Sequence, residues 1–171
     1  MDLGCAPGSW LQYLSDAVGK KGAIVGYDIV DVRVGAFNVR TFVANVRELT
    51  SDRVRKDLAE WVAELKGATA PDPVPPSFGA DLLVSDMAPK LTGIRDADQA
   101  RSVELVQYAL QLAEAVVSNP DGKFAAKLFQ GRDTDAFLEV VKKVFRTVKL
   151  IKPEATREGS REVFVVGETK R

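Results

Sequence analysis

The first ten residues of the chain, Met1–Trp10, constrain its fold more than any other stretch. The Asp-Leu pair after the first methionine is typical of the end of a buried strand, and Gly4 and Gly8 permit a tight turn because neither carries a Cβ atom. Pro7 suits the first turn of a helix, where a missing backbone N–H costs nothing. A strand, a glycine turn and a helix N-terminus in this order direct backbone N–H groups toward one point. We therefore expect that point to suit a carboxylate or a phosphate.

The spacing within this turn is D-x-G-x-x-x-G, which differs from the G-x-G-x-x-G of dinucleotide-binding proteins. It lacks the spacing that holds a pyrophosphate, but it leaves room for a small carboxylate. An ordinary strand-to-helix turn explains these ten residues equally well. The function must therefore be sought in what the rest of the chain places beside this turn.

The chain has 171 residues, of which 46% are hydrophobic and 28% charged, and we expect residues 1–171 to form a single soluble domain with a substantial core. No apolar run is long enough to span a membrane, and no signal peptide precedes the first strand. Cys5 is the only cysteine and the chain has no histidine, which excludes an internal disulfide, His-based catalysis and His-ligated metals. We expect a cytoplasmic protein that uses neither a metal nor a membrane.

Short apolar stretches alternate with amphipathic segments along the whole chain. The apolar stretches predict strands ending at residue 3 and over 23–28, 40–43, 81–85, 123–129, 147–151 and 162–167. The amphipathic segments predict helices after residue 7, over 51–66, through 103–117 and through 137–145. Only about ten residues join the last two strands, too few for a helical crossover, so these strands should pair antiparallel. This pattern predicts a Rossmann-like α/β fold with a seven-stranded, mostly parallel sheet, an antiparallel last strand and helices on both faces, as in S-adenosylmethionine (SAM)-dependent methyltransferases.

Polar residues follow or interrupt three of these strands near the edge where such sheets bind ligands. Asp28 ends the second strand about 20 positions after the glycine turn, where nucleoside-binding folds bind ribose hydroxyls. Asp86 follows the fourth strand in the run Asp-Met-Ala-Pro, which packing alone does not explain, and the polar loop 90–98 is of the kind that closes over a substrate. Lys127 lies inside the fifth strand among apolar neighbours, although a lone strand lysine usually extends to solvent.

Four motifs occur in order over essentially the whole chain: Asp-Leu-Gly-Cys-Ala-Pro-Gly-Ser-Trp, Val-Ser-Asp-Met-Ala-Pro, Ala-Lys-Leu-Phe-Gln-Gly and Ser-Arg-Glu-Val-Phe-Val-Val. Together they resemble the FtsJ/RrmJ family of ribosomal RNA large-subunit methyltransferases. The resemblance implies a SAM-dependent enzyme that moves a methyl group to the 2′-oxygen of a uridine ribose. It also implies that ribosomal RNA or the large ribosomal subunit is the partner.

The resemblance further implies roles for individual residues. The SAM-binding positions are matched by Gly4, Gly8, Trp10, Asp28, Asn45 and Asp86. The last three members of the family's catalytic Lys-Asp-Lys-Glu set are matched by Asp86, Lys127 and Glu162. Asn45 stands where the family usually has an aspartate that binds the adenine amino group, and its side-chain oxygen can still accept that bond. The first lysine of the set lies upstream of the glycine turn and has no counterpart here; a natural variant, a misplaced start or a shortened chain would each account for this.

The implied chemistry requires a ribose hydroxyl to be oriented and to lose its proton, because the methyl group of SAM is already activated. A lysine can accept a proton only if its pKa is lowered by burial or by another cation. We expect Lys127 to be this base and Asp86 to hold both Lys127 and the sulfonium side of SAM. Outside the family pattern, Glu162 could simply pair with Arg161 or Lys152.

The net charge is zero, so any affinity for RNA must come from local basic clusters. We predict that residues from loops at or beside the carboxyl ends of the strands form one basic rim: Lys90, Arg95, Arg132, Arg157 and Arg161. Three alternatives stay open: a non-catalytic SAM- or RNA-binding assembly factor, a 2′-O-methyltransferase of another RNA such as a tRNA or an RNA cap, and a nicotinamide-dependent oxidoreductase. The missing G-x-G-x-x-G disfavours the last of these. We expect the protein to be a monomer.

Overall fold

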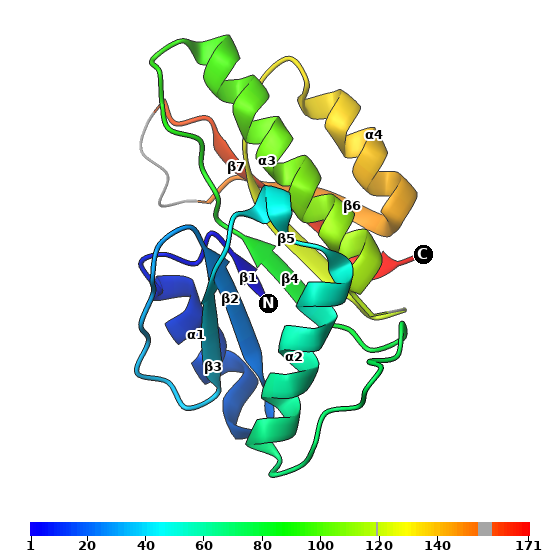
Figure 1. The fold of residues 1–171 in the computed structure, drawn as a ribbon. Coiled ribbons are helices and arrows are strands. Elements are labelled where there is room, and N and C mark those ends of the chain that lie inside the picture. The colour runs from blue at the N-terminus through cyan, green and yellow to red at the C-terminus, as the bar shows by residue number, and fades with distance from the viewer. Residues whose placement is uncertain (119, 154–158) are drawn as a thin grey trace.

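The computed structural model describes residues 1–118, 120–153 and 159–171, which build a seven-stranded sheet with helices on both faces (Figure 1). The strands are β1 (Asp2–Leu3), β2 (Ile24–Asp28), β3 (Val39–Val43), β4 (Leu82–Ser85), β5 (Lys123–Phe129), β6 (Phe145–Ile151) and β7 (Glu162–Lys170). Their order across the sheet is β3-β2-β1-β4-β5-β7-β6. The first five strands are parallel, and β7 pairs antiparallel with both β5 and β6. The predicted fold class and the antiparallel final pair are confirmed.

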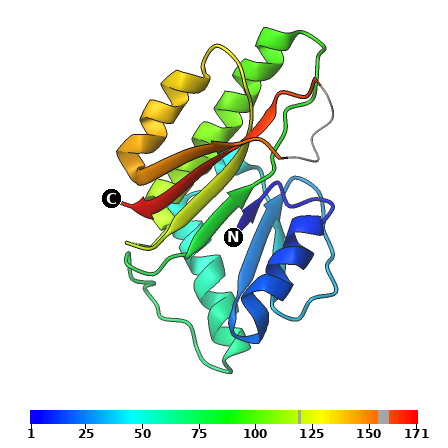
Figure 2. The same ribbon diagram turned by 180° about the vertical axis from the view of Figure 1, so that it is seen from behind.

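The α-helices are α1 (Ser9–Val18), α2 (Ser51–Leu65), α3 (Arg95–Val116) and α4 (Thr134–Val144). Helices α2, α3 and α4 cover one face of the sheet, and α1 lies on the other face (Figures 1 and 2). The larger part of the core fills the space under α2, α3 and α4, where Leu3, Leu83 and Phe124 are fully buried. A smaller cluster with Leu11 and Val84 lies under α1. Burial on both faces explains why the central strands are almost continuously apolar.

Several boundaries differ from the prediction, among them the end of β7, which continues to Lys170, and two of the differences have a clear local cause. The expected loop 90–98 ends early, because α3 begins at Arg95 and the buried carboxylate of Asp98 organises the residues before it. The expected helix through Phe145 ends at Val144, and Phe145 instead begins β6, where it packs against Phe124 with ring centroids 5.8 Å apart. Both corrections concern tertiary contacts that periodicity does not reveal.

The sheet topology places the ends of several strands at one edge. Strand β1 lies between β2 and β4, and the chain turns from β1 into α1 on one side of this junction. The strand order reverses here, since β2 and β3 extend to one side of β1 and β4 and β5 to the other. Ligands of doubly wound sheets bind at the carboxyl ends of the strands at such a point.

Candidate active site

A cavity of about 660 Å³ opens at this edge of the sheet. Its walls come from the carboxyl ends of the five parallel strands and from α3. Six of the predicted site residues line it: Gly4, Asp28, Asn45, Asp86, Lys90 and Lys127. The cavity therefore joins predicted residues from five separate strands, or from the segments that follow them, in one place.

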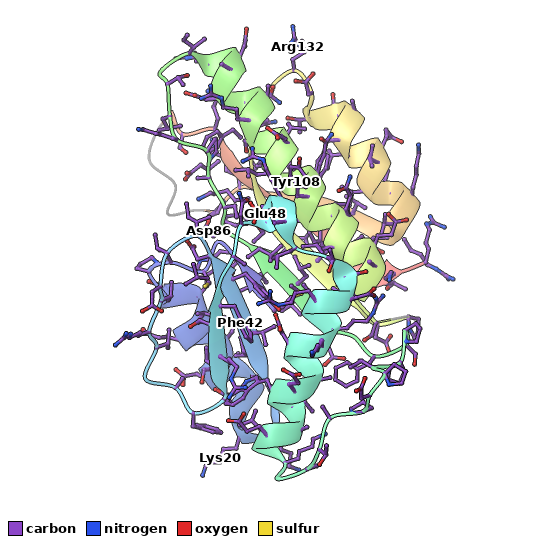
Figure 3. The ribbon with its side chains drawn as sticks, viewed as in Figure 1. Lys20, Phe42, Glu48, Asp86, Tyr108 and Arg132 are labelled. Atoms are coloured by element: carbon purple, nitrogen blue, oxygen red, sulfur yellow. The ribbon has the colours of Figure 1, made fainter. Side chains whose placement is uncertain are left out.

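Lys127 and Asp86 form an ion pair on the wall of this cavity. The Nζ atom of Lys127 lies 2.8 Å from Oδ1 of Asp86, and the Lys127 side chain is only 12% exposed. The parallel register places Val84 of β4 beside Ala125 of β5, so two residues further on the two charged side chains meet at the same level. Figure 3 shows Asp86 where β4 ends, at the centre of the molecule. The expectation that Asp86 holds Lys127 agrees with this geometry.

Glu162 does not line the cavity, but the sheet places it near Lys127. In the antiparallel pair, Lys127 lies opposite Phe164 and Phe129 lies opposite Glu162. Alternate residues of a strand share a face, so Glu162 is the diagonal neighbour of Lys127 on that face, at a spacing of about 7–8 Å. A long glutamate side chain at this spacing can reach a substrate held beside Lys127.

The carboxylate of Asp28 is fixed by two backbone groups. Its Oδ2 accepts a hydrogen bond from Ala6 N at 2.8 Å, and its Oδ1 accepts one from Val30 N at 3.2 Å. Both bonds orient a carboxylate at the cavity wall at the end of β2, where it can accept hydrogen bonds from the two hydroxyls of a ribose.

The backbone N–H groups at the start of the glycine turn do not face a ligand, contrary to the prediction from the sequence. The N–H groups of Gly4 and Cys5 both donate to Tyr27 O, so these amides bind β2 and do not point at a ligand. Pro7 also lies before the helix, which begins at Ser9 after the N-cap residue Gly8. Glycine is required at residue 4 by the protein itself, because a Cβ there would lie 2.5 Å from Cγ of Met87 and the backbone φ is +74°.

Two other predicted SAM-binding residues, Gly8 and Trp10, lie outside the cavity lining. A Cβ on Gly8 would lie 2.8 Å from Cγ2 of Val34, so this glycine too is packed against protein. The Trp10 ring stacks on Phe164 with centroids 5.5 Å apart. These residues therefore pack against protein at the start of α1. The Trp10 side chain lies on the sheet beside Lys127, because Phe164 is the residue opposite Lys127.

Asn45 precedes the short 3₁₀ helix η2 (Val46–Glu48), and its Oδ1 accepts a hydrogen bond from Arg47 N at 3.1 Å. The Arg47 guanidinium pairs with Glu104 of α3 at 3.1 Å and lies over the Tyr108 ring. Figure 3 places Tyr108 on α3 beside η2. The cavity wall thus includes residues that the sequence analysis did not assign to the site: Arg47, Met87, Arg101 and Glu104. Met87 belongs to the Asp-Met-Ala-Pro run after β4, but no motif marks Arg47, Arg101 and Glu104, and Arg47 meets Glu104 only because η2 docks on α3.

Asp2 begins the first of the four motifs, although it is not one of the predicted site residues. It is fully buried in β1, and within the described part of the chain neither carboxylate oxygen has a hydrogen-bond partner. Burial raises its pKa from 3.8 to about 7, the nearby Asp86 and Asp28 add to this, and the α-ammonium of Met1 offsets only part of it. The carboxyl group of Asp2 therefore lies close to those of Asp28 and Asp86, and the negative charges of Asp28 and Asp86 at the cavity wall favour a positively charged ligand.

The predicted basic rim is only partly assembled. Lys90 lines the cavity, and Nη2 of Arg161 lies 3.5 Å from the backbone oxygen of Arg95, so these two arginines are neighbours. Arg132 pairs weakly with Asp133 at 3.7 Å and lies well away from Asp86 in Figure 3. Arg157 lies outside the described residues.

The model of one protein family, described as FtsJ-like methyltransferase, matches residues 1–170. The chain belongs to the FtsJ-like methyltransferase family. Its relatives include the ribosomal RNA large subunit methyltransferase E of Bdellovibrio bacteriovorus, which is 39% identical over 171 residues that span all of this chain and 79% of that protein. The protein of the same name from Myxococcus xanthus is 40% identical over 171 residues, which span all of this chain and 72% of that protein.

Two solved structures agree with the fold of this FtsJ-like methyltransferase. A candidate ribosomal RNA methyltransferase from Plasmodium falciparum superimposes with a TM-score of 0.77 at 22% identity, over 99% of this chain and 84% of that chain. Human methyltransferase-like protein 13, solved in complex with SAH, gives a TM-score of 0.58 at 18% identity, over 98% of this chain and 69% of that chain. The family resemblance seen in the four motifs is confirmed.

The residues of the cavity fit SAM, the methyl donor of this FtsJ-like methyltransferase. SAM carries a sulfonium and an ammonium group, and the carboxylates of Asp2, Asp28 and Asp86 lie at or beneath the cavity with Lys127 as the cation paired to Asp86. Within the described residues, no group of three or more His, Cys, Asp or Glu side chains could hold a metal ion. In the same residues, no helix is long and apolar enough to cross a membrane.

Proposed function

We propose that this FtsJ-like methyltransferase methylates the 2′-oxygen of a uridine ribose in large-subunit ribosomal RNA. The observation that carries the proposal is the Lys127–Asp86 ion pair of 2.8 Å on the wall of the cavity. A 2′-hydroxyl must lose its proton to react, and these two side chains are placed to receive and stabilise that proton. The relatives named as large-subunit methyltransferases support ribosomal RNA as the substrate.

SAM supplies an electrophilic methyl group when it is bound. Asp28 orients the ribose of the cofactor, and Asn45 borders the cavity at the end of β3. Asp86 holds the side chain of Lys127 in place. In its neutral form Lys127 would accept the proton of the substrate hydroxyl as the hydroxyl oxygen takes the methyl group and the methyl–sulfur bond breaks. Glu162, diagonal to Lys127 on the sheet, positions the substrate ribose or relays this proton. Proximity and orientation supply much of the remaining rate enhancement.

The proposal extends to the partner and setting of the protein. Residues 1–171 work as one domain and as a monomer in the cytoplasm, where ribosomal RNA is accessible. Lys90, Arg95 and Arg161 provide the cations that bind phosphates next to the cavity, since phosphate contacts dominate nonspecific RNA affinity. Gly8 and Trp10 contribute through the backbone of the first turn of α1, which has N–H groups without intrahelical partners.

The test is methyl transfer from SAM carrying a labelled methyl group to large ribosomal subunits, followed by digestion to nucleosides. We expect the label in 2′-O-methyluridine. Label in a base-methylated nucleoside would contradict the ribose assignment, and a protein that binds SAM and RNA without transferring label would be the non-catalytic assembly factor. Transfer to tRNA or capped RNA but not to large subunits would mean that one of these other RNAs is the substrate.

A further inference from the structure

The loop between β4 and α3 presents two apolar side chains to solvent beside the active site. Leu91 and Ile94 are each 66% exposed, whereas the same loop begins at Met87–Lys90 on the cavity wall. Single exposed apolar residues are common on protein surfaces and need no explanation. Leu91 and Ile94 lie three positions apart on one loop next to the cavity, and we call this pair of exposed side chains the 91/94 ledge.

The backbone of this loop is held by a buried carboxylate. Asp98 is 4% exposed and accepts three hydrogen bonds: from Thr92 N at 2.8 Å, from Thr92 Oγ1 at 2.7 Å and from Gly93 N at 3.1 Å. Gly93 has a φ of +82°, which lets the chain reverse between Leu91 and Ile94. Burying a carboxylate is costly unless it is hydrogen-bonded in this way. The hydrogen bonds to Asp98 therefore hold the backbone of the segment that carries Leu91 and Ile94.

Cations flank the ledge on both sides. Lys90 precedes it at the cavity wall, and Arg95 follows it at the start of α3. Arg161, the residue before β7, also lies close by, with its Nη2 atom 3.5 Å from the backbone oxygen of Arg95. Among the acids of this segment, Asp98 is buried and fully engaged, and Asp96 is exposed in the first turn of α3. The local surface is thus apolar in the middle and predominantly basic around it.

We propose that the 91/94 ledge binds the face of an unpaired base adjacent to the target nucleotide. This inference rests on the proposed function and names the chemistry of its substrate: single-stranded RNA. Nucleic-acid phosphates pair with cations, and a base that is not stacked in a helix can pack against apolar as well as aromatic side chains. Asp98 is a positioning residue, because it acts through the backbone of Thr92 and Gly93 and does not touch the RNA.

The experiment uses the full chain with two fluorescent probes, a decauridylate and an abasic chain with the same number of phosphates. The variant Leu91→Ser/Ile94→Ser removes the ledge from the surface without touching the core. The matched control Val18→Ser/Leu65→Ser changes two exposed apolar residues at the ends of α1 and α2. We expect the unaltered protein and the control to bind decauridylate about threefold to tenfold more tightly than the abasic probe, as for partial burial of two aliphatic side chains. The ledge variant should bind the two probes equally.

A second set of variants tests Asp98. Asp98→Asn places an amide N–H₂ group against the donors of Thr92 and Gly93, and Thr92→Val removes the hydroxyl that donates to Asp98. Both should lose the preference for decauridylate while they bind SAM normally, and Thr92→Ser, which keeps the hydroxyl, should retain the preference. A purely structural role would change thermal stability without changing the ratio of the two RNA affinities.

Two results would contradict the proposal that the 91/94 ledge binds a base. The first is a ledge variant that keeps the preference for decauridylate, and the second is an unaltered protein that methylates RNA but binds both probes equally. An unaltered protein that neither binds RNA nor methylates it would instead overturn the proposed function, and the ledge with it. These outcomes separate the two claims.

Discussion

The ammonium nitrogen of Lys127 lies 2.8 Å from Oδ1 of Asp86, so the cavity wall carries a charge pair between β5 and the loop that follows β4. Lys127 is almost covered, whereas the Asp86 side chain is 36% exposed toward the cavity. One carboxylate therefore faces both the proposed base and the space for the cofactor. This arrangement gives Asp86 two tasks that a single substitution should disturb together.

Asp86→Asn should weaken SAM binding and slow methyl transfer at the same time. The amide keeps the shape of the side chain but removes the negative charge that holds Lys127 and favours a cationic ligand. Calorimetric titration with SAM and single-turnover transfer to RNA measure the two effects separately. A variant that loses only one of them would mean that Asp86 has one task.

Asp28→Asn should weaken SAM binding by on the order of 1.5–3 kcal/mol, the value of a hydrogen bond to a charged group. The reason is that Asp28 offers a fixed carboxylate at the end of β2. The matched control is Asp31→Asn, because Asp31 is an exposed acid that pairs with the exposed Arg33 at 3.1 Å. Equal SAM affinities of the Asp28 and Asp31 variants in calorimetry would remove Asp28 from the site.

Asp2→Asn should stabilise the cofactor-free protein at neutral pH. Burial raises the pKa of Asp2 from 3.8 to about 7, so the folded protein holds a proton that the unfolded chain has released between these values. The free energy of unfolding of the unaltered protein therefore falls as the pH rises from about 4 to about 7 and is level above this window. In thermal denaturation the variant should gain on the order of 1–4 kcal/mol at pH 8 and nothing at pH 4. A gain that is the same at both pH values would exclude ionisation of Asp2 as its cause.

Gly4→Ala should destabilise the protein more than Gly67→Ala. Both glycines have positive φ, +74° at Gly4 and +63° at Gly67, so alanine strains the backbone at each by about 1–2 kcal/mol. Only at Gly4 would the new Cβ also lie 2.5 Å from Met87 Cγ and 3.1 Å from the Met87 backbone. Chemical denaturation gives the loss in the free energy of unfolding for each variant, and the difference between the two losses measures this contact. Equal losses would show that Met87 moves aside at no cost.

Much of the fold could be predicted because local patterns and tertiary packing agree. The apolar strands, the glycine turn and the short connection before β7 each point to the same sheet, and the structure has that sheet. Trp61 illustrates the same consistency, since a residue on the apolar stripe of α2 is 7% exposed in the core. The strand-end acids Asp28 and Asp86 could be found for the same reason, because parallel strands bring their carboxyl ends together.

The rest of the site depends on contacts between distant segments. The backbone N–H groups of Gly4 and Cys5 donate hydrogen bonds to the backbone oxygen of Tyr27 on the neighbouring strand. The sequence of the turn alone does not reveal these bonds. Arg47 and Glu104 are 57 positions apart and meet only because η2 docks on α3. The burial of Asp2 could not be predicted either, since an aspartate is almost never fully buried unless it is paired.

The most direct test of the central claim is the single-turnover rate of Lys127→Met with SAM and unmethylated large ribosomal subunits. The variant keeps an unbranched, partly buried side chain but removes the proposed base. General-base catalysis contributes about 10²–10⁴-fold, so we expect the rate to fall by that factor while the affinity for SAM is unchanged. A Lys127→Met variant that binds SAM and transfers the methyl group at the unaltered rate would contradict the account.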